Sequence, residues 1–266
     1  MEMEKSTSRH RTSVNNSNIL LLTATITPLS GVPLLARTDP SVRLDDYANA
    51  LKFYLSLVGQ CVDYILFVEN SNSDISRLRA IVNQANLTKS VEFIVFEGLD
   101  YPPAYGRGYG EFKLVEYAMN HSTILNSQPG ESIVWKVTGR YITKNICRII
   151  TSKPSCFDVY CHFRNRPIRQ AEMYLVAWTC SGYQAGLKNI YHELKDKPTN
   201  HHPEVAFRNA LERRSKTIKI IPRFKVTPFF DGIHGRDNRR FSSKPLYLLK
   251  YYVRRTVSWV MPWLWI

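Results

Sequence analysis

The sequence lacks the cysteine patterns that would define a metal module. It has five cysteines, and none of them forms a Cys-x-x-Cys pair or a Cys/His spacing typical of zinc ligands. A cysteine-ligated zinc site is therefore not expected. We expect reduced thiols in a cytoplasmic protein, at Cys61, Cys147, Cys156, Cys161 and Cys180.

Long hydrophobic runs and nucleotide-loop glycines are also missing. Residues 1–18 are polar, so we expect neither a signal peptide nor a membrane anchor there, and residues 1–17 are predicted to form a disordered tail. Residues 244–266 are rich in aromatic side chains but lack the ~20 uninterrupted apolar residues of a membrane span. No Gly-x-Gly-x-x-Gly follows the first predicted strand, which disfavours a dinucleotide-binding fold.

Acidic residues are scarce relative to basic ones. The chain has 36 Lys and Arg against 22 Asp and Glu, which gives a net charge of +14. Such a balance favours a polyanionic partner, and nucleic acid, an anionic membrane surface and phosphorylated substrates all qualify. At 266 residues with 44% hydrophobic residues, the chain can bury one substantial core.

The first half alternates short apolar runs with helical periodicity, which predicts an α/β fold with a parallel, Rossmann-type nucleotide-binding sheet. In such sheets ligands bind at the carboxyl ends of the strands. The predicted strands are residues 18–26, 64–68, 91–96 and 132–137, and the predicted helices are residues 43–58, 74–82 and 110–121.

The second half follows a different rhythm. Two predicted strands without a helix between them are followed by two helices, which indicates a mixed region able to form an acceptor site. We therefore expect one domain over residues 18–243, with a nucleotide half at 18–141 and an acceptor half at 142–243. The predicted strands are residues 157–163 and 172–179, and the predicted helices are residues 183–194 and 203–213.

Polar side chains follow the first two predicted strands. Thr25, Arg37 and Arg43 come after the first strand and could hold a nucleotide base and phosphates, since a helix start also favours anions. A capped helix start with solvated arginines is the alternative. Glu69 and Asn70 follow the second strand and could bind ribose hydroxyls or the base edge, although an Asn/Ser-rich turn needs no ligand.

Glycines and cations mark the next two strand ends. Gly108 and Gly110 stand before a helix, where they permit close backbone approach to a ligand, and Arg107 adds positive charge. A purely conformational glycine turn is the alternative. Lys136 and Arg140 close the fourth strand, where fixed cations would stabilise a leaving diphosphate. Lys136 could instead point into the core.

Candidate residues in the second half include one carboxylate in a favourable place. Glu204 lies in the first turn of a predicted helix, where it stays ionised and could accept a proton from an acceptor hydroxyl, or simply cap the helix. A loop over residues 228–240 joins aromatic, Gly, His and Arg residues and could close over a diphosphate, with His234, Arg236 and Arg239 as donors, or be a solvated basic loop. The candidates for acceptor binding, which could equally coat an exposed face, are Asp158, Arg164 and Arg169.

Residues 244–266 mix aromatic and basic side chains, a composition that suits the headgroup layer of an anionic bilayer. We expect an amphipathic, membrane-associating segment. A helix packed on the core, or a partner's docking helix, is the alternative.

Taken in order, these motifs resemble bacterial glycosyltransferases of polysaccharide and lipopolysaccharide synthesis that have the GT-A fold. The resemblance spans residues 18–241. It rests on Thr-Ala-Thr-Ile-Thr-Pro after the first strand, on Arg-Thr-Asp-Pro before the first helix, on Glu-Asn after the second strand, on Gly-Tyr-Gly-Glu, and on Lys-Val-Thr-Gly-Arg-Tyr at the fourth strand.

The resemblance implies transfer from a nucleoside diphosphate sugar to a glycan or lipid-linked acceptor, at the cytoplasmic face of the inner membrane. It also implies that Glu204 is the base of an inverting reaction. The chain departs from the family in lacking an Asp-x-Asp pair after the fourth strand, so we expect no cofactor, with a divalent metal as the alternative. Two other classes stay open: a nucleic-acid-binding or RNA-modifying α/β protein, and a non-catalytic glycan assembly factor.

Overall fold

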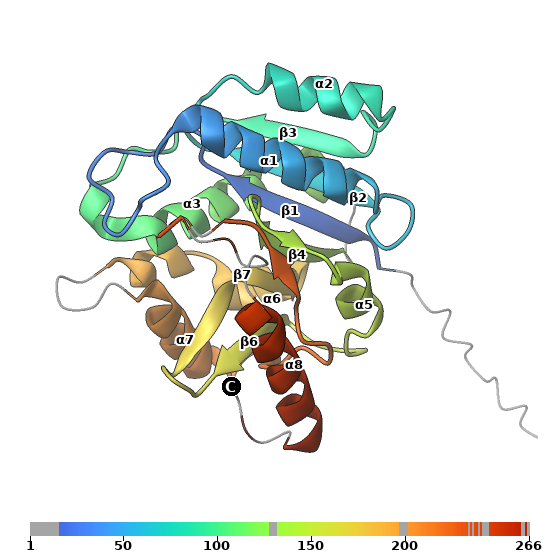
Figure 1. Ribbon diagram of the computed structural model, residues 1–266, viewed down its shortest axis with the longest axis vertical. Coiled ribbons are helices and arrows are strands. Elements are labelled where there is room, and N and C mark those ends of the chain that lie inside the picture. The colour runs from blue at the N-terminus through green and yellow to red at the C-terminus, as the bar shows by residue number, and fades with distance from the viewer. Residues whose placement is uncertain are drawn as a thin grey trace, which may run out of the picture.

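The computed structural model describes residues 16–127, 132–196, 202–233, 235, 237–238, 240, 245–261 and 264. The predicted disordered tail therefore lies almost entirely outside the described residues. A seven-stranded sheet forms the centre, in the order β3-β2-β1-β4-β7-β6-β8 (Figure 1). Its strands are β1 Asn18–Ala24, β2 Tyr64–Glu69, β3 Val91–Val95, β4 Ile133–Thr138, β6 Val159–Arg164, β7 Gln170–Thr179 and β8 Ile220–Ile221.

The strands of the first half are all parallel, as predicted. β1 pairs with β2 on one side and with β4 on the other, and β2 pairs with β3. The second half adds β7 antiparallel to β4, β6 antiparallel to β7, and β8 parallel to β6. The prediction of a mainly parallel α/β sheet continued by a mixed half is confirmed.

Helices cover both faces of this sheet (Figure 1). A small sheet also joins β5 (Ile142–Thr143) to β9 (Phe230–Asp231). The α-helices are α1 Pro40–Leu55, α2 Ser76–Gln84, α3 Gly106–His121, α4 Thr123–Ser127, α5 Ile146–Thr151, α6 Cys180–Gly182, α7 Pro203–Arg214 and α8 Pro245–Val260. Single turns of other helix types lie at Pro103–Tyr105, Tyr183–Leu187 and Ile190–Leu194.

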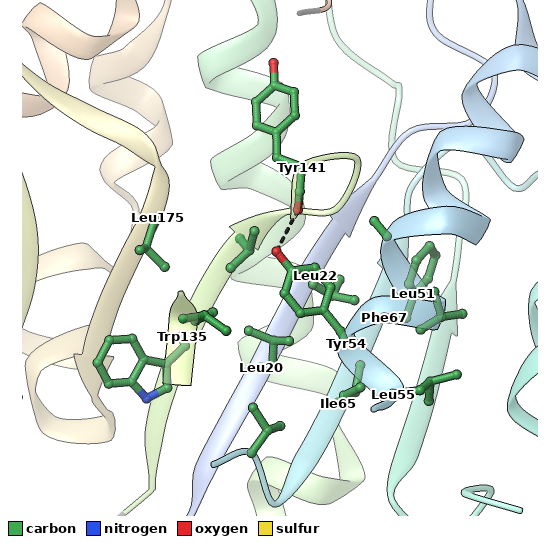
Figure 2. Close-up of a cluster of buried hydrophobic side chains, with 14 of the residues drawn as sticks. Leu20, Leu22, Leu51, Tyr54, Leu55, Ile65, Phe67, Trp135, Tyr141 and Leu175 are labelled. Carbon is green, nitrogen blue, oxygen red and sulfur yellow. Dashed lines mark hydrogen bonds between the residues drawn. The ribbon is translucent and has the colours of Figure 1, made fainter. Parts of the chain in front are cut away.

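The alternation of side chains along each strand divides the core into two layers. On one face, Leu20 and Leu22 of β1 and Trp135 of β4 pack against Leu51 and Tyr54 of α1, as Figure 2 shows. On the other face, side chains of the same strands meet α3 and α7. Because β1 is buried on both faces, its uninterrupted apolar run has the composition of a central parallel strand.

Some helix boundaries differ from the predicted ones for clear reasons. α1 begins at Pro40, because the Asp39 carboxylate caps it by accepting hydrogen bonds from the backbone N–H groups of Ser41 and Val42. α3 begins at Gly106, since the glycine run forms its first turn. The single helix predicted over residues 183–194 is wrong, because Asn189 adopts a left-handed conformation with φ of 60° and separates two short turns.

One prediction about the cysteines is also wrong. Cys61 and Cys147, which are separated by 86 positions in sequence, form a disulfide with their Cα atoms 5.4 Å apart. Cys61 precedes β2 and Cys147 lies in α5, and the fold brings these elements together. Sequence spacing gives no sign of such a pairing, whereas Cys156, Cys161 and Cys180 are free thiols as expected.

Among the helices that the structure describes, none has both the length and the apolar content needed to cross a bilayer. The segment that was predicted to associate with membranes forms α8, a helix of 16 residues.

The order of strands creates a switch point beside β1. The chain runs from β1 to β2 and β3 on one side of the sheet, and then returns to place β4 on the other side. Connections therefore leave the carboxyl ends of β1 and β4 in opposite directions, and a crevice opens between them.

Candidate functional site

A cavity of about 720 Å³ opens at this switch point. The carboxyl ends of β1 and β4 form its floor, through residues that include Thr23 and Thr138. Residues at the start of α3, after β4, on β6 and β7, and on α7 and α8 complete its lining. Its volume lies within the range of small-molecule sites, roughly 300–1,000 Å³.

The floor holds a buried ion pair. Lys136 is fully buried on the face of β4 that packs against α3, and its Nζ lies 2.6 Å from Glu111 Oε1. The same carboxylate oxygen accepts hydrogen bonds from the hydroxyls of Thr23 (2.8 Å) and Thr138 (2.7 Å). Lys136 also donates to the carbonyl oxygen of Met173. Lys136 thus points into the core, which was the alternative to diphosphate binding.

The surroundings keep Glu111 ionised. Burial alone would raise the pKa of this carboxyl, but the Lys136 ammonium, together with the two threonine hydroxyls, holds the pKa below its usual value. Glu111 lines the cavity, so its network forms a rigid polar floor under any ligand.

Arg140 and Arg107 bring positive charge to the wall beside β4. Arg140 is largely buried, stands over the Tyr141 ring at 5.4 Å, and donates one long hydrogen bond of 3.3 Å to the carbonyl oxygen of Ile233. Within the described residues, no carboxylate lies within ion-pair distance of either arginine. Both guanidinium groups line the cavity and are therefore available to an anionic ligand.

Tyr141 lies between these two arginines and the core. Its carbonyl oxygen accepts a hydrogen bond of 2.6 Å from the Tyr54 hydroxyl, while its ring points away from the buried cluster in Figure 2. Burial raises the pKa of the Tyr141 phenol, and the charges of Arg140 and Arg107 oppose that rise. Both cations therefore act on the same corner of the cavity.

Arg43 has a structural role in addition to facing the cavity. Its guanidinium donates to the carbonyl oxygens of Thr25 and Arg37 and thereby fastens the loop after β1 to α1. Thr25 also lines the cavity, and its hydroxyl donates to the Asn70 amide oxygen at 2.6 Å. The two residues define the β1 edge of the site.

Three other predicted donor-binding residues do not line the cavity. Arg37 pairs with both carboxylate oxygens of Asp46, at 2.5 and 2.8 Å. Glu69 is fully buried and accepts hydrogen bonds from the backbone N–H groups of residues 26, 71 and 73, so it organises the turn after β2. Asn70 is buried beside it and contacts the site only through Thr25.

The glycines before α3 serve close packing as well as lining the cavity. A Cβ at Gly108 would lie 2.3 Å from Pro203, and one at Gly110 would lie 1.9 Å from the Tyr101 hydroxyl oxygen. Side chains there would separate α3 from α7 and from the preceding loop. Close packing of α3, and not a special backbone conformation, therefore explains these two glycines, and both also contribute to the surface of the cavity.

Glu204 lines the same cavity as the two arginines, and the residue before it, Pro203, lies close to Gly108 of α3. It occupies the first turn of α7 directly after Pro203, is partly exposed, and lines the cavity. It makes no hydrogen bond or ion pair to any residue that the structure describes. A carboxylate that is held at a helix start with free lone pairs can accept a proton from a bound hydroxyl.

Beside Glu204, β6 and β7 contribute a second polar cluster. Arg164 Nη1 lies 2.9 Å from Glu172 Oε1, and both side chains line the cavity together with His162 and Tyr174. Burial raises the pKa of Glu172 although Arg164 opposes the rise. For His162, burial together with nearby arginines lowers the pKa to about 3, so the imidazole is neutral.

The other predicted acceptor residues lie elsewhere. Asp158 is at the opposite end of β6, where it accepts a hydrogen bond of 2.7 Å from the backbone N–H of Lys219. Arg169 is exposed and pairs with Glu212 of α7. Of the three residues predicted for acceptor binding, the structure brings only Arg164 to the cavity.

Two loops meet over the strand ends. Within residues 25–39, the backbone N–H groups of Ala36 and Arg37 donate to the carbonyl oxygen of Gly235, at 2.9 and 3.1 Å. Pro28, Leu29, Val32 and Leu35 of the same loop line the cavity with apolar surface. The predicted diphosphate donors His234, Arg236 and Arg239 lie outside the described residues.

No group of three or more His, Cys, Asp or Glu side chains within the described parts of the chain is arranged to hold a metal ion.

Several lining residues escaped the sequence prediction. Glu111 is the last residue of the glycine motif, so its position beside two predicted ligand-binding glycines could have identified it. Tyr141 follows Arg140 directly. By contrast, Tyr251 and Arg254 of α8 reach the cavity from a segment that local pattern places outside the domain.

Neither a protein-family model nor a curated protein sequence matches this chain. Some solved structures are similar to it in backbone arrangement. A protein of Desulfovibrio desulfuricans G20 assigned as a nucleotide-diphospho-sugar transferase has 9% identity and a TM-score of 0.46, over 78% of this chain and 79% of that one. For 4-diphosphocytidyl-2C-methyl-D-erythritol synthase from Anaerococcus prevotii, the identity is 10% and the TM-score 0.43, over 90% and 97%.

The bifunctional glycosyltransferase WbbM has 10% identity and a TM-score of 0.41, over 79% of this chain and 39% of that one. The similarity of these proteins to the chain is one of backbone arrangement. The motif-based resemblance to polysaccharide glycosyltransferases stays a prediction.

Proposed function

We propose that the chain is a glycosyltransferase, which moves a sugar from a nucleoside diphosphate sugar to a glycan or lipid-linked acceptor by a metal-independent, inverting reaction. The observation that carries the proposal is that one cavity at the switch point contains both unpaired cations and a carboxylate without a hydrogen-bond partner in the described structure. Arg107 and Arg140, without carboxylate partners among the described residues, line this cavity together with Glu204. Such a combination suits an anionic leaving group at the arginines and a hydroxyl nucleophile at the carboxylate.

In the proposed reaction, the acceptor hydroxyl oxygen attacks the anomeric carbon as its proton passes to the Glu204 carboxylate. The bond between the anomeric carbon and the diphosphate oxygen breaks, and the electron pair stays on the departing nucleoside diphosphate. Arg140 and Arg107 stabilise the negative charge that develops on this group. The Lys136–Glu111 pair keeps the floor in place and takes no part in proton transfer.

The β1 edge suits the nucleoside part of the donor. Thr25 and Tyr47 provide polar atoms there, and Leu29, Val32 and Leu35 provide an apolar cover. An apolar surface with few polar groups is typical of sites that bind a base and a sugar.

A thermal-shift screen tests the class of ligand. Nucleoside diphosphates, their sugar conjugates and nucleoside triphosphates are added to the full chain, each with and without EDTA. We expect a diphosphate sugar and its diphosphate to raise the unfolding temperature in EDTA, because ligands that bind only the native state stabilise it. Stabilisation by triphosphates alone, or by RNA alone, would contradict the proposal.

The Glu204→Gln variant separates binding from chemistry. It should keep the donor-induced shift, since the amide has the same shape, and its sugar transfer should fall by roughly 10²–10⁴-fold because the base is lost. Full transfer by this variant would exclude Glu204 as the base.

A further inference from the structure

Helix α8 presents two different faces. On one face, Tyr251 packs against Phe229 with ring centroids 4.8 Å apart, and both Tyr251 and Arg254 line the cavity. On the other, Leu249 is 59% exposed, Tyr252 56%, Val253 49% and Val260 53%. These four residues are separated by three, four and eleven positions from Leu249, so they share one side of the helix. The helix therefore exposes an apolar side to solvent.

The charge of this segment indicates which surface covers that side. Besides Arg254, which lines the cavity, residues 244–266 contain Lys244, Lys250 and Arg255 and no Asp or Glu. Nucleic acid would pair with the cations but leave the apolar side uncovered. An anionic bilayer satisfies both, because apolar side chains enter the acyl boundary while lysine and arginine contact lipid phosphates.

The inner face of α8 meets the part of the cavity that β6 and β7 line. In the proposed function this part is the acceptor end. Arg254 joins Arg164 and Glu172 there. Two buried polar atoms at this end, His162 Nδ1 and Arg164 Nε, have no hydrogen-bond partner in the part of the chain that the structure describes. Buried polar atoms without partners are costly, so this end is prepared for a polar ligand group.

We propose that α8 docks the protein on an anionic bilayer through Leu249, Tyr252, Val253 and Val260, and at the same time completes the acceptor end of the cavity through Arg254. A single helix then joins the membrane surface to the acceptor site. The acceptor is accordingly a saccharide attached to a membrane lipid. This identification of the acceptor class rests on the proposed glycosyltransferase function, whereas bilayer docking does not.

Vesicle sedimentation tests the docking. The full chain is mixed with vesicles of phosphatidylcholine alone, or of equimolar phosphatidylcholine and phosphatidylglycerol. Wild type should bind the anionic vesicles more strongly and lose part of that affinity at high salt. The Leu249→Glu/Val253→Glu double variant should bind at least about tenfold more weakly, because two carboxylates replace two inserted apolar side chains.

Leu34→Glu is the matched control. Leu34 is also an exposed apolar residue, but it lies in the loop after β1 and outside the cavity lining, so its variant should bind vesicles like wild type. Equal binding by the double variant, equal binding to both vesicle types, or no binding by wild type would each overturn the docking. A donor-induced thermal shift in the double variant shows that the fold is retained.

The acceptor class is tested with radiolabelled donor and vesicles made from the lipid extract of the native host. Label should enter the butanol-extractable fraction with wild type, and much less with the double variant. Arg254→Gln should reduce transfer while vesicle binding is unchanged. Label that appears only in water-soluble product, at the same rate for all three proteins, would overturn the lipid-linked acceptor. Absence of transfer by wild type would overturn it together with the proposed function, and would leave the vesicle result standing.

Discussion

Arg140 differs in its environment from a buried cation that forms an ion pair. It is largely buried, has no carboxylate partner in the described structure, and faces the cavity beside Arg107. Burying an unpaired charge is unfavourable unless a ligand compensates it. The side chain therefore fits a role in stabilising an anion that is present during reaction.

Replacement of Arg140 by alanine tests that role. We expect kcat/KM to fall by roughly 10²–10³-fold, as for the removal of other fixed groups that stabilise developing charge. The measurement is the rate of nucleoside diphosphate release with a donor from the screen. Arg169→Ala is the control, because Arg169 is an exposed arginine outside the cavity, and it should retain activity. Similar rates for both variants would remove Arg140 from the mechanism.

Lys136, unlike Arg140, has a carboxylate partner inside the fold, because its ammonium group forms an ion pair with Glu111. Lys136→Ala leaves the Glu111 carboxylate without its ion pair, and breaking a buried pair from one side typically costs about 3–5 kcal/mol in the free energy of unfolding. Urea denaturation measures this loss. The double variant Lys136→Met/Glu111→Leu should recover much of the stability because neither charge is left unpaired. An unchanged midpoint for Lys136→Ala would show that the pair is not structural.

His162 predicts part of the pH dependence of stability. Its pKa is lowered from the ordinary 6.5 to about 3, chiefly by burial and then by the charges of Arg223, Arg164 and Arg254. Between these pH values the unfolded chain binds a proton that the native protein does not. The free energy of unfolding therefore decreases as pH falls from 6.5 towards 3, by about 1.4 kcal/mol for each pH unit.

Urea unfolding of the His162→Gln variant at a series of pH values in that range tests this effect. The variant should show a shallower loss of stability on acidification than wild type. Identical slopes for the two proteins would mean that His162 is protonated in the native state.

At the scale of elements, the sequence predicted the sheet well because its signals are local. Each strand of the first half has an apolar run of its own, and the polar residues after those runs meet at one edge of a parallel sheet. The sequence could not show that the Lys136 side chain is buried in an ion pair and does not face a ligand. That side chain is buried because Glu111, 25 positions earlier, arrives beneath it on α3.

Long-range contacts account for the other differences. Arg37 was predicted to bind the donor, but it forms an ion pair with Asp46 of α1. Asp158 was predicted to bind the acceptor, but it lies at the end of β6 that is remote from the cavity. Arg254 reaches Arg164 across 90 positions through the placement of α8, and no periodicity predicts such a meeting.

The disulfide between Cys61 and Cys147 is a further contact of this kind, and it joins α5 to the segment before β2. A disulfide typically stabilises a protein by about 2–4 kcal/mol, mainly by restricting the unfolded chain. Cys61→Ser should therefore lower the free energy of urea unfolding by this amount without reductant. Cys156→Ser, which removes an exposed free thiol, is the control. Equal stability of the two variants would show that the bond does not form in solution.

At the scale of the whole molecule, one cavity joins the two halves of the sheet. The parallel half provides a polar floor and two cations, and the mixed half provides Glu204 and the cluster around Arg164. The loops over residues 25–39 and around Gly235 meet above the strand ends. In the proposed reaction, donor and acceptor therefore share this one cavity, with Arg140 and Arg107 at the diphosphate.

The most direct test of this account is sugar transfer in the presence of EDTA. Nucleoside diphosphate release is followed with wild type and a donor from the thermal-shift screen, before and after exhaustive chelation, and then with added magnesium or manganese. We predict that the rate in EDTA equals the rate with metal, because Arg140 and Arg107 supply the charge that a divalent cation would otherwise provide. If release stops on chelation and returns only with magnesium or manganese, the proposed metal-independent mechanism is wrong.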